Sequence, residues 1–501
     1  MGSASNVPRV IIIGSGFAGI CMAIKLKQAG IDRFTILEKS DGLGGTWRDN
    51  VYPGAACDVP SFSYCYSFEQ GTSWSRKWAP QAEILEYMEA CARKYGIRPH
   101  VRLGTEVSQA RFDEPSGVWQ VTTAAGETLE AEVLVSAVGQ LNRPAYPDIP
   151  GLDGFDGLTF HSARWRHDED LTGKTVAVIG NAASAIQFIP QIAKTVGTLR
   201  IFQRSPNWMI RRGDREYGEG EKAMFAAFPF LARLYRWWIW ARLEMRFPLF
   251  RRNKIFTRAL TRIATEDMHS RVADPAMREA LRPDYPVGAK RLLISDDYYE
   301  ALGRDNVELI TSPIERASPS GLVTTDGTEH GADAIILATG FESTRFLVPM
   351  KVHGTSEQSL DEAWSDGAHA YLGITVSGFP NFFMLYGPNT NLGHNSIIFM
   401  IECQVAYIME CIEALTTTHL QYLDVRPEVM AAYNAELQAR LGRSVWAATG
   451  KSWYKTAAGK ITNNWSSTTT RYWWKTRHVD FGAYRQNIRE HEGEARPARA
   501  A

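Results

Sequence analysis

The sequence is poor in cysteine, carries no excess charge of either sign and has no long apolar stretch free of charged residues. The six cysteines are Cys21, Cys57, Cys65, Cys91, Cys403 and Cys411. They form no Cys-x-x-Cys pair, so the sequence indicates neither a zinc site nor a disulfide reductase, and we expect no metal. So few cysteines in 501 residues fit a reduced, cytoplasmic chain.

The charges balance, because 55 basic residues face 55 acidic ones. No overall field therefore favours a nucleic acid or an anionic membrane as a partner. The most apolar long window, residues 228–250, contains four arginines and a glutamate, which is too many charges for a membrane-spanning helix. A buried-strand pattern begins at Val10 and leaves no room for a signal peptide. We expect no nucleic-acid and no membrane partner.

The first nucleotide-binding pattern lies at the N-terminus. The apolar run Val10–Ile13 is followed at once by Gly14, Gly16 and Gly19 and then by a helical pattern. Such glycines allow a tight turn, close approach of the backbone to a pyrophosphate, and packing of helix on sheet. A second short strand ends in Glu38, where an acid accepts hydrogen bonds from a ribose. A free ribose 2′-hydroxyl favours FAD or NAD over NADP at this turn.

A loop rich in glycine and aromatic residues follows at residues 44–58. Its two glycines, its Pro-Gly turn and the interleaved Trp and Tyr allow the backbone to lie close to a flat ring. We expect Gly45, Thr46 and Trp47 to contact that ring. The loop ends at Asp58, which as a lone residue would be a turn-capping acid.

A second strand–turn–helix pattern starts at Thr175 and departs from the first. It reads Gly180-Asn181-Ala182-Ala183-Ser184-Ala185, with Ala182 where the middle glycine is expected. The added methyl crowds the approach of a pyrophosphate, which predicts weaker or displaced binding. The residues expected at this cofactor are Gly180, Ala182, Ser184 and Ala185.

The next strand ends in Arg204-Ser205, with a base where the first unit has an acid. A guanidinium suits a 2′-phosphate and so favours NADPH over NADH. The alternative is a solvated surface arginine.

Between the two patterns lies Phe155-Asp156-Gly157-Leu158-Thr159-Phe160-His161-Ser162-Ala163-Arg164-Trp165. The order Phe-x-Gly-x-x-x-His-x-x-x-Trp resembles the fingerprint of the Baeyer–Villiger monooxygenases, class B flavoenzymes that use FAD and NADPH. The loop 44–58 is similar to a second pattern of that family, Gly-Gly-x-Trp, four residues, Tyr-Pro-Gly, three residues and Asp. One departure is Arg166, where the family usually has Pro or Asp.

The resemblance implies roles for single residues. Arg291, in a Lys-Arg-x-Leu segment, would be the catalytic arginine, Asp58 its partner near the flavin, and His161 a coordinator of the two nucleotide domains. Lys290 would support the 2′-phosphate. Alternatives stay open for each: a Lys-Arg pair is ordinarily a surface feature, and His161 fits packing at a domain boundary. Tyr64 at the flavin and Trp465 at the nicotinamide fit core packing equally well.

The family's reaction converts a ketone into an ester or lactone with O2 and NADPH, through a C4a-peroxyflavin. The resemblance therefore implies FAD and NADPH as cofactors and a small-molecule ketone as substrate. Two alternatives are an N- or S-oxygenating flavin monooxygenase of the same architecture and a catalytically silent flavin-binding sensor. The sequence does not indicate which ketone is oxidised.

The expected fold class is α/β, with two Rossmann-like dinucleotide-binding domains, for FAD and NADPH, and a small helical insertion whose aromatic residues we expect in its core. The expected division is 1–145 for the first part of the FAD domain and 146–213 for the first part of the NADPH domain. Residues 214–285 form the insertion, 286–375 the rest of the NADPH domain, and 376–501 the C-terminal part of the FAD domain.

Overall fold

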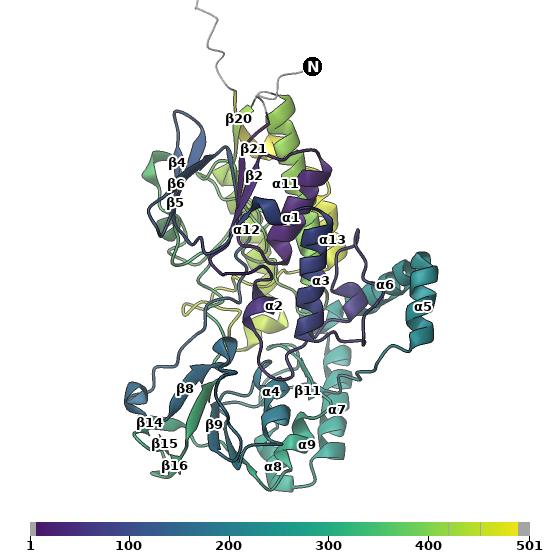
Figure 1. Cartoon of the computed structure of the whole chain (residues 1–501), viewed down its shortest axis with the longest axis vertical. Coiled ribbons are helices and arrows are strands. Elements are labelled where there is room, and N and C mark those ends of the chain that lie inside the picture. Colours follow the sequence, from purple (N-terminus) through teal and green to yellow (C-terminus); the bar gives the residue numbers. More distant parts are fainter. Residues whose placement is uncertain (1–6, 419, 451, 489–501) are drawn as a thin grey trace, which may run out of the picture.

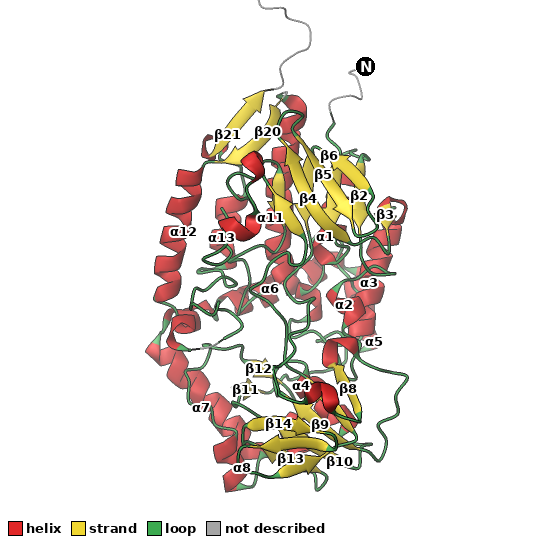
Figure 2. Cartoon of the chain, turned by 90° about the vertical axis from the view of Figure 1, so that its left-hand side faces the viewer, coloured by secondary structure: helices red, strands yellow, loops and turns green. Residues whose placement is uncertain are grey.

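The computed structural model describes residues 7–418, 420–450 and 452–488. Two five-stranded sheets occupy the two ends of an elongated molecule, with loops and helices between them (Figures 1 and 2). The chain begins and ends its described part at the end that holds the first sheet. No helix among the described residues is long and apolar enough to cross a membrane.

The first sheet is parallel throughout and carries the N-terminal glycine turn. Its order is β19 (Phe382–Met384), β7 (Val133–Ser136), β1 (Val10–Ile13), β2 (Phe34–Leu37) and β3 (Val101–Arg102). All four residues of β1 are buried, as a strand covered on both faces requires. The helices α1 (Phe17–Gln28), α3 (Gln81–Lys94) and α11 (Ile397–Thr417) pack together beside it.

The second sheet repeats this plan with the second glycine turn. Its order is β13 (Val307–Ile310), β10 (Thr198–Phe202), β9 (Thr175–Ile179), β17 (Ala334–Leu337) and β8 (Leu158–His161), again all parallel. The helices α4 (Ala185–Ile192) and α9 (Tyr298–Leu302) contact each other on this unit. The His161 segment thus forms an edge strand of the second sheet.

Smaller sheets and helices complete the two units. The further strands are β4 (Val107–Asp113), β5 (Val118–Thr123), β6 (Thr128–Ala131) and β18 (Lys351–His353); β14 (Ile314–Ser318), β15 (Gly321–Thr324) and β16 (Glu329–Gly331); β11 (Met209–Ile210) and β12 (Leu293–Ile294); and β20 (Leu420–Val425) and β21 (Tyr484–Ile488). The short or C-terminal helices are α2 (Thr46–Asp49), α10 (Leu360–Ala363), α12 (Pro427–Gly442), α13 (Thr469–Thr476), η1 (Ser61–Ser63), η2 (Arg98–His100), η3 (Leu152–Gly154), η4 (Ser162–Arg164), η6 (Thr355–Glu357), η7 (Val445–Ala448) and η8 (Phe481–Ala483).

The sequence pattern of residues 101–105, taken alone, would also suit an antiparallel strand. The structure has only β3, Val101–Arg102, and it pairs in parallel with β2. The antiparallel pairing starts later, with β4 against β5. Short polar-flanked runs look alike in both settings, because the alternation of side chains does not reveal the direction of the neighbouring strand.

Residues 219–280 are helical, comprising α5 (Glu219–Ala227), α6 (Pro229–Glu244), η5 (Phe247–Arg251), α7 (Lys254–Arg271) and α8 (Pro275–Ala280). The expectation that the aromatic residues here belong to a core is wrong for several of them. Phe228, Phe230, Trp237 and Trp238 are each more than half exposed. The helical pattern predicted the helices but did not show which of their two apolar faces is buried.

Candidate active site

A single large cavity of about 1020 Å³ is lined by both glycine turns. Both turns follow directly on the carboxyl ends of parallel strands, Gly14 after β1 and Gly180 after β9. This is where open α/β sheets bind their ligands. The cavity is large enough for an extended dinucleotide together with a second ligand.

The first glycine turn is shaped by close contacts that exclude side chains. A Cβ on Gly14, whose φ is +99°, would lie 2.8 Å from the carbonyl oxygen of Ala137, and one on Gly19 would lie 2.0 Å from that of Gly14. Gly16 meets nothing closer than 3.9 Å and, with Gly14, lines the cavity. Gly19 does not line it. It brings α1 against the turn, so that the helix N-terminus points its amide donors at the cavity.

Glu38 is fixed at the end of β2. Its Oε2 accepts hydrogen bonds from the backbone N–H and the hydroxyl of Ser15, at 2.8 and 2.7 Å, and its Oε1 accepts one from the N–H of Ser40 at 2.9 Å. The residue is only 6% exposed, yet it lines the cavity. A buried carboxylate held in this way is preorganised to accept further hydrogen bonds from a ligand hydroxyl.

The loop 44–58 forms another part of the cavity wall. Gly45, Thr46 and Trp47 line it, as does Tyr64. The indole N–H of Trp47 donates to the Tyr64 hydroxyl at 3.1 Å, and the two rings meet edge to face. Tyr64 also packs edge to face on Phe17. These aromatic contacts make a rigid wall suited to a flat ring.

The second glycine turn is built like the first. A Cβ on Gly180, at φ +107°, would lie 2.5 Å from the carbonyl oxygen of Ala338. Ala182 and Ser184 line the cavity, and Ala182 is exposed to it. Ala185 does not reach the cavity and is fully buried in the core of this unit. The methyl group of Ala182 thus projects where the expected glycine would leave open space.

Arg204, Ser205 and Lys290 form a basic corner of the cavity. The Lys290 ammonium donates to the Ser205 hydroxyl at 3.0 Å and lies 4.3 Å from the centre of the Tyr285 ring. Burial, and then the charge of Arg204, lower the pKa of Lys290. A buried ammonium that a neighbouring guanidinium destabilises is a preformed site for an anion.

Arg291 and Asp58 come together at the cavity wall. The Arg291 Nε donates to Asp58 Oδ2 at 2.7 Å, and the Nη2 of Arg291 contacts the same oxygen. About a third of each side chain stays exposed, and both line the cavity. The negative charge of Asp58 raises the pKa of Arg291 further above its ordinary value. The guanidinium is therefore permanently charged and held in one orientation.

Residues of the second unit hold the loop that carries Asp58. Gln187 of α4 accepts a hydrogen bond from the Tyr52 hydroxyl at 3.0 Å and donates one to the Ala56 carbonyl at 3.0 Å. Arg212 donates from Nη2 to the Cys57 carbonyl at 3.1 Å. The backbone immediately before Asp58 is thus fixed from the side of the chain that carries Arg291.

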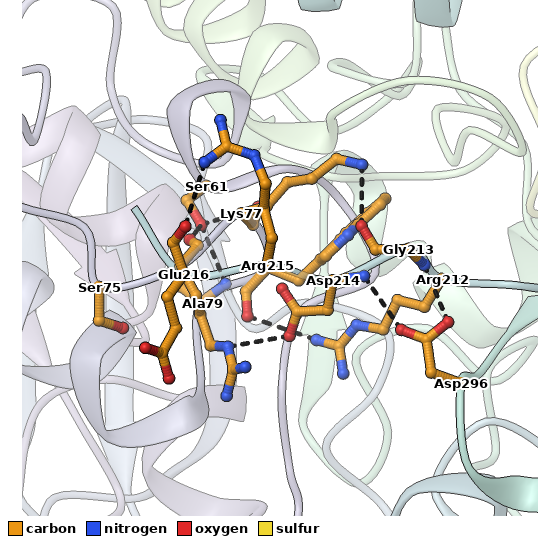
Figure 3. Close-up of polar contacts among 12 residues, drawn as sticks. Ser61, Ser75, Lys77, Ala79, Arg212, Gly213, Asp214, Arg215, Glu216 and Asp296 are labelled. Carbon is orange, nitrogen blue, oxygen red and sulfur yellow. Dashed lines mark hydrogen bonds and ion pairs between the residues drawn. The ribbon is translucent and has the colours of Figure 1, made fainter. Parts of the chain in front are cut away.

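Figure 3 shows how Arg212 is itself anchored. The carboxylate of Asp296, which follows β12, accepts the backbone N–H groups of Gly213 and Asp214 at 2.9 and 3.0 Å. The segment then runs beside residues 75–77, where the Lys77 N–H donates to the Arg215 carbonyl at 2.9 Å. We call residues 212–215, with these contacts, the Arg212 strap. Because Asp296 lies five residues after Arg291, the strap links the segment that carries Arg291 to the loop that carries Asp58. Nothing in the sequence marks these contacts, because the partners of the Arg212 and Asp296 side chains are backbone groups that every residue has.

His161 ends β8 and is only 1% exposed. Its Nδ1 accepts the Ala163 N–H at 3.1 Å, and its buried Nε2 has no partner among the described residues. The ring does not line the cavity but packs edge to face on Tyr146 and Phe341, which do. Burial lowers the pKa of His161 to about 4, so the ring is neutral at pH 7.

Trp465 does not contribute to the cavity. It is 2% exposed, packs edge to face on Tyr472, and donates its indole N–H to the Thr468 carbonyl at 2.9 Å. The structure therefore favours the core alternative over a place at the nicotinamide. The Asn463-Asn464-Trp465 sequence does not distinguish a tryptophan in the core from one beside the nicotinamide.

Several cavity residues were missed by the sequence analysis, including Gln140, Arg143, Tyr386 and Asn391. The Tyr386 hydroxyl donates to Asn391 Oδ1 at 2.7 Å, and Gln140 donates to the Tyr386 carbonyl at 3.0 Å. Buried atoms of Gln140 (Oε1) and Arg143 (Nη1) have no partner among the described residues. Tyr386 has a φ of +58°, but nothing in the sequence marks this conformation. No cluster of metal-ligating side chains occurs within the described ranges.

The chain is similar to known proteins over nearly its whole length. Residues 11–218 match a family model described as pyridine nucleotide-disulphide oxidoreductase. A Baeyer-Villiger monooxygenase of Pseudomonas aeruginosa is 42% identical over 96% of this chain and 92% of its own length. A Baeyer-Villiger monooxygenase of Streptomyces coelicolor is also 42% identical, over 95% of this chain and 92% of its own length. The crystal structure of OTEMO in complex with FAD and NADP superposes with a TM-score of 0.87 at 29% identity, covering 96% of this chain and all of that one.

Proposed function

The chain belongs to the Baeyer–Villiger monooxygenases, and from this premise we propose that it uses FAD, NADPH and O2 to convert a ketone into an ester or lactone. The observation that carries the proposal is the Arg291–Asp58 pair in a cavity shared by two dinucleotide turns. A charged guanidinium fixed at that place suits the stabilisation of negative charge during oxygen insertion.

The first unit fits FAD. Gly14 and Gly16 leave room for a pyrophosphate against the N-terminus of α1, and Glu38 is held to accept hydrogen bonds from a ribose. Gly45, Thr46, Trp47 and Tyr64 would lie along the flavin ring.

The second unit fits NADPH. Arg204, Ser205 and Lys290 would bind the 2′-phosphate, and Gly180, Ala182 and Ser184 would lie beside the pyrophosphate. A phosphate at Lys290 would favour the charged form of its ammonium, which burial disfavours in the protein alone. The cation pair thus supports a preference for NADPH over NADH.

Bound between the first glycine turn and the 44–58 loop, FAD would supply the redox chemistry of the reaction, with NADPH as the reductant and O2 as the oxidant. Arg291 holds a fixed positive charge at the cavity wall and cannot lose its proton near neutral pH. Asp58 orients that guanidinium, and the strap through Arg212 holds Asp58. His161 is neutral and packs on Tyr146 and Phe341, both of which line the cavity, and we assign to it the coordination of the two nucleotide-binding units.

We also propose the division of the chain at about residues 145, 213, 285 and 375, because the two sheets draw their strands from these ranges. A cytoplasmic location is supported by the six cysteines, which are all free thiols and all buried.

The proposal is tested by mixing the purified, FAD-loaded protein with NADPH and a panel of ketones, sulfides and amines. We expect esters or lactones from ketones, formed in proportion to the NADPH consumed. An enzyme that oxygenates only sulfides or amines would contradict the proposed substrate class. If NADPH does not reduce the bound flavin, the protein is instead a flavin-binding sensor.

A further inference from the structure

The helical region around α6 exposes an unusual number of large apolar side chains. Of the thirteen exposed large hydrophobic residues in the described part of the chain, nine lie within residues 228–263. They are Phe228, Phe230, Leu234, Trp237, Trp238, Met245, Ile255, Phe256 and Ile263. Clustering on this scale marks an interaction site, because scattered exposed apolar residues need no partner.

The exposed large apolar residues of α6 and of its C-cap, Met245, share one face of that helix. Phe230, Leu234, Trp237 and Met245 follow the spacing i, i+4, i+7 and i+15, which places them along a single stripe. They are 52%, 60%, 59% and 67% exposed.

The opposite face of α6 is already used by the fold. It buries Ala232, Ile239 and Leu243, and Arg236 anchors it through hydrogen bonds to the Phe62 and Cys65 carbonyls, both at 2.9 Å. The exposed stripe is therefore not the core-facing side of a displaced helix. Figure 1 shows α5 and α6 standing out at one side of the molecule, away from both sheets.

The same region is strongly basic, although the whole chain has no net charge. Residues 228–263 contain nine basic residues and one acid, Glu244. The basic residues are Arg233, Arg236, Arg242, Arg246, Arg251, Arg252, Lys254, Arg258 and Arg262. Only Arg262 forms an ion pair with a described residue, Glu266.

Glu244 does not compensate this charge at the surface. Its carboxylate points inward and accepts hydrogen bonds from Asn395, Thr469 and Thr470. By helical geometry Arg233 and Arg242 flank the apolar stripe of α6 on its two sides. An apolar, Trp-bearing stripe with an arginine on each side fits the pattern of a helix that lies in a membrane interface.

We propose that α6, with the basic residues that follow it, docks on the surface of a bilayer containing anionic phospholipids. The charge of this surface complements anionic headgroups, and its Trp side chains suit the boundary between headgroups and acyl chains. A second copy of the chain is a poorer occupant, because a symmetric contact would bring the arginines of one copy against those of the other. The proposal revises the expectation of no membrane partner, which the balanced total charge had suggested. It does not rest on the proposed reaction.

The test is co-flotation of the FAD-loaded protein with vesicles of phosphatidylcholine alone, or of phosphatidylcholine mixed with phosphatidylglycerol. We expect binding to the mixed vesicles only, and weaker binding as salt rises. The double variant Arg233→Gln/Arg242→Gln should reduce the partition by on the order of tenfold. Leu234→Ser/Trp237→Ser should reduce it at least as much, because it removes the inserted apolar area.

The matched control is Arg98→Gln/Arg316→Gln, which removes two exposed arginines from η2 and β14 and should bind vesicles as the unmodified protein does. All variants should keep their bound FAD, since the changed side chains lie on the surface. Failure of the unmodified protein to float with the mixed vesicles would overturn the proposal. A second contradicting outcome is that the unmodified protein binds no vesicles but sediments as a dimer, and that Leu234→Ser/Trp237→Ser dissociates this dimer.

Discussion

The Nε atom of Arg291 lies 2.7 Å from Oδ2 of Asp58, although 233 positions separate the two residues in the chain. Arg291 precedes β12 in the second unit, whereas Asp58 ends a loop of the first. Their pairing therefore depends on how the two units are held against each other.

Arg291→Ala should abolish oxygen insertion while leaving reduction by NADPH largely intact. The lost charge stabilisation corresponds to at least about a hundredfold in the rate of ester formation. The measurement is ester formed per NADPH consumed. Arg291→Lys should recover only part of the rate, because an ammonium cannot reproduce the two contacts with Asp58. Ester formation by Arg291→Ala at the normal rate would contradict the assigned role.

Arg212→Ala should uncouple the enzyme through Asp58. Without the hydrogen bond to the Cys57 carbonyl, the loop end that carries Asp58 loses its fixed position. We expect the yield of ester per NADPH to fall by about tenfold, with little change in the KM for NADPH. The control is Arg211→Ala, because the adjacent Arg211 pairs with Asp267 instead. An equal loss of yield in both variants would argue against a positioning role for Arg212.

Arg204→Ala should weaken the discrimination between the two nicotinamide cofactors. Loss of the guanidinium should raise the KM for NADPH by roughly tenfold to a hundredfold and leave that for NADH nearly unchanged. Arg200→Ala is the control, since Arg200 pairs with Glu308 on the neighbouring strand. If the ratio of the two KM values does not move, the 2′-phosphate lies elsewhere.

Glu38→Ala should lower the amount of FAD retained during purification. The change removes the acceptor for the proposed ribose hydroxyls and leaves the buried Ser15 amide without its partner. The absorbance of bound flavin per protein measures this loss. Glu86→Ala, at an exposed position of α3, should retain FAD normally.

His161 should make the stability of the protein depend on pH. Its pKa is about 4 in the folded chain, against about 6.5 when unfolded. Between these two pH values the unfolded state binds more protons than the folded state. The contribution of neutral His161 to the free energy of unfolding is therefore complete above about pH 6.5 and is lost as the pH falls toward 4. Lowering the pH from about 7.5 to 5 should cost about 2 kcal/mol through this residue.

The measurement is the urea midpoint at both pH values. His161→Asn should show a smaller shift between them than the unmodified protein. His478→Asn changes a largely exposed histidine and should keep the full shift. Equal shifts in all three proteins would show that His161 does not titrate as its burial requires.

The sequence by itself determined the parts of the site that depend on local backbone chemistry. Gly14 and Gly180 adopt positive φ against a neighbouring carbonyl, which only glycine tolerates, and so both turns were predictable. The strands β1 and β9 were predictable as well, because strands buried on both faces are apolar throughout.

Only the tertiary structure decided which distant residues meet. The Arg212 strap joins the side chains of Arg212 and Asp296 to backbone groups that every residue has, and Trp465 could be placed in the core only once Tyr472 was beside it. The α6 helix is apolar on two faces, so its periodicity could not show that Ile239 is buried and Trp237 exposed. Local pattern fixes the conformation of a segment, but the free energy of burial depends on what the rest of the chain brings against it.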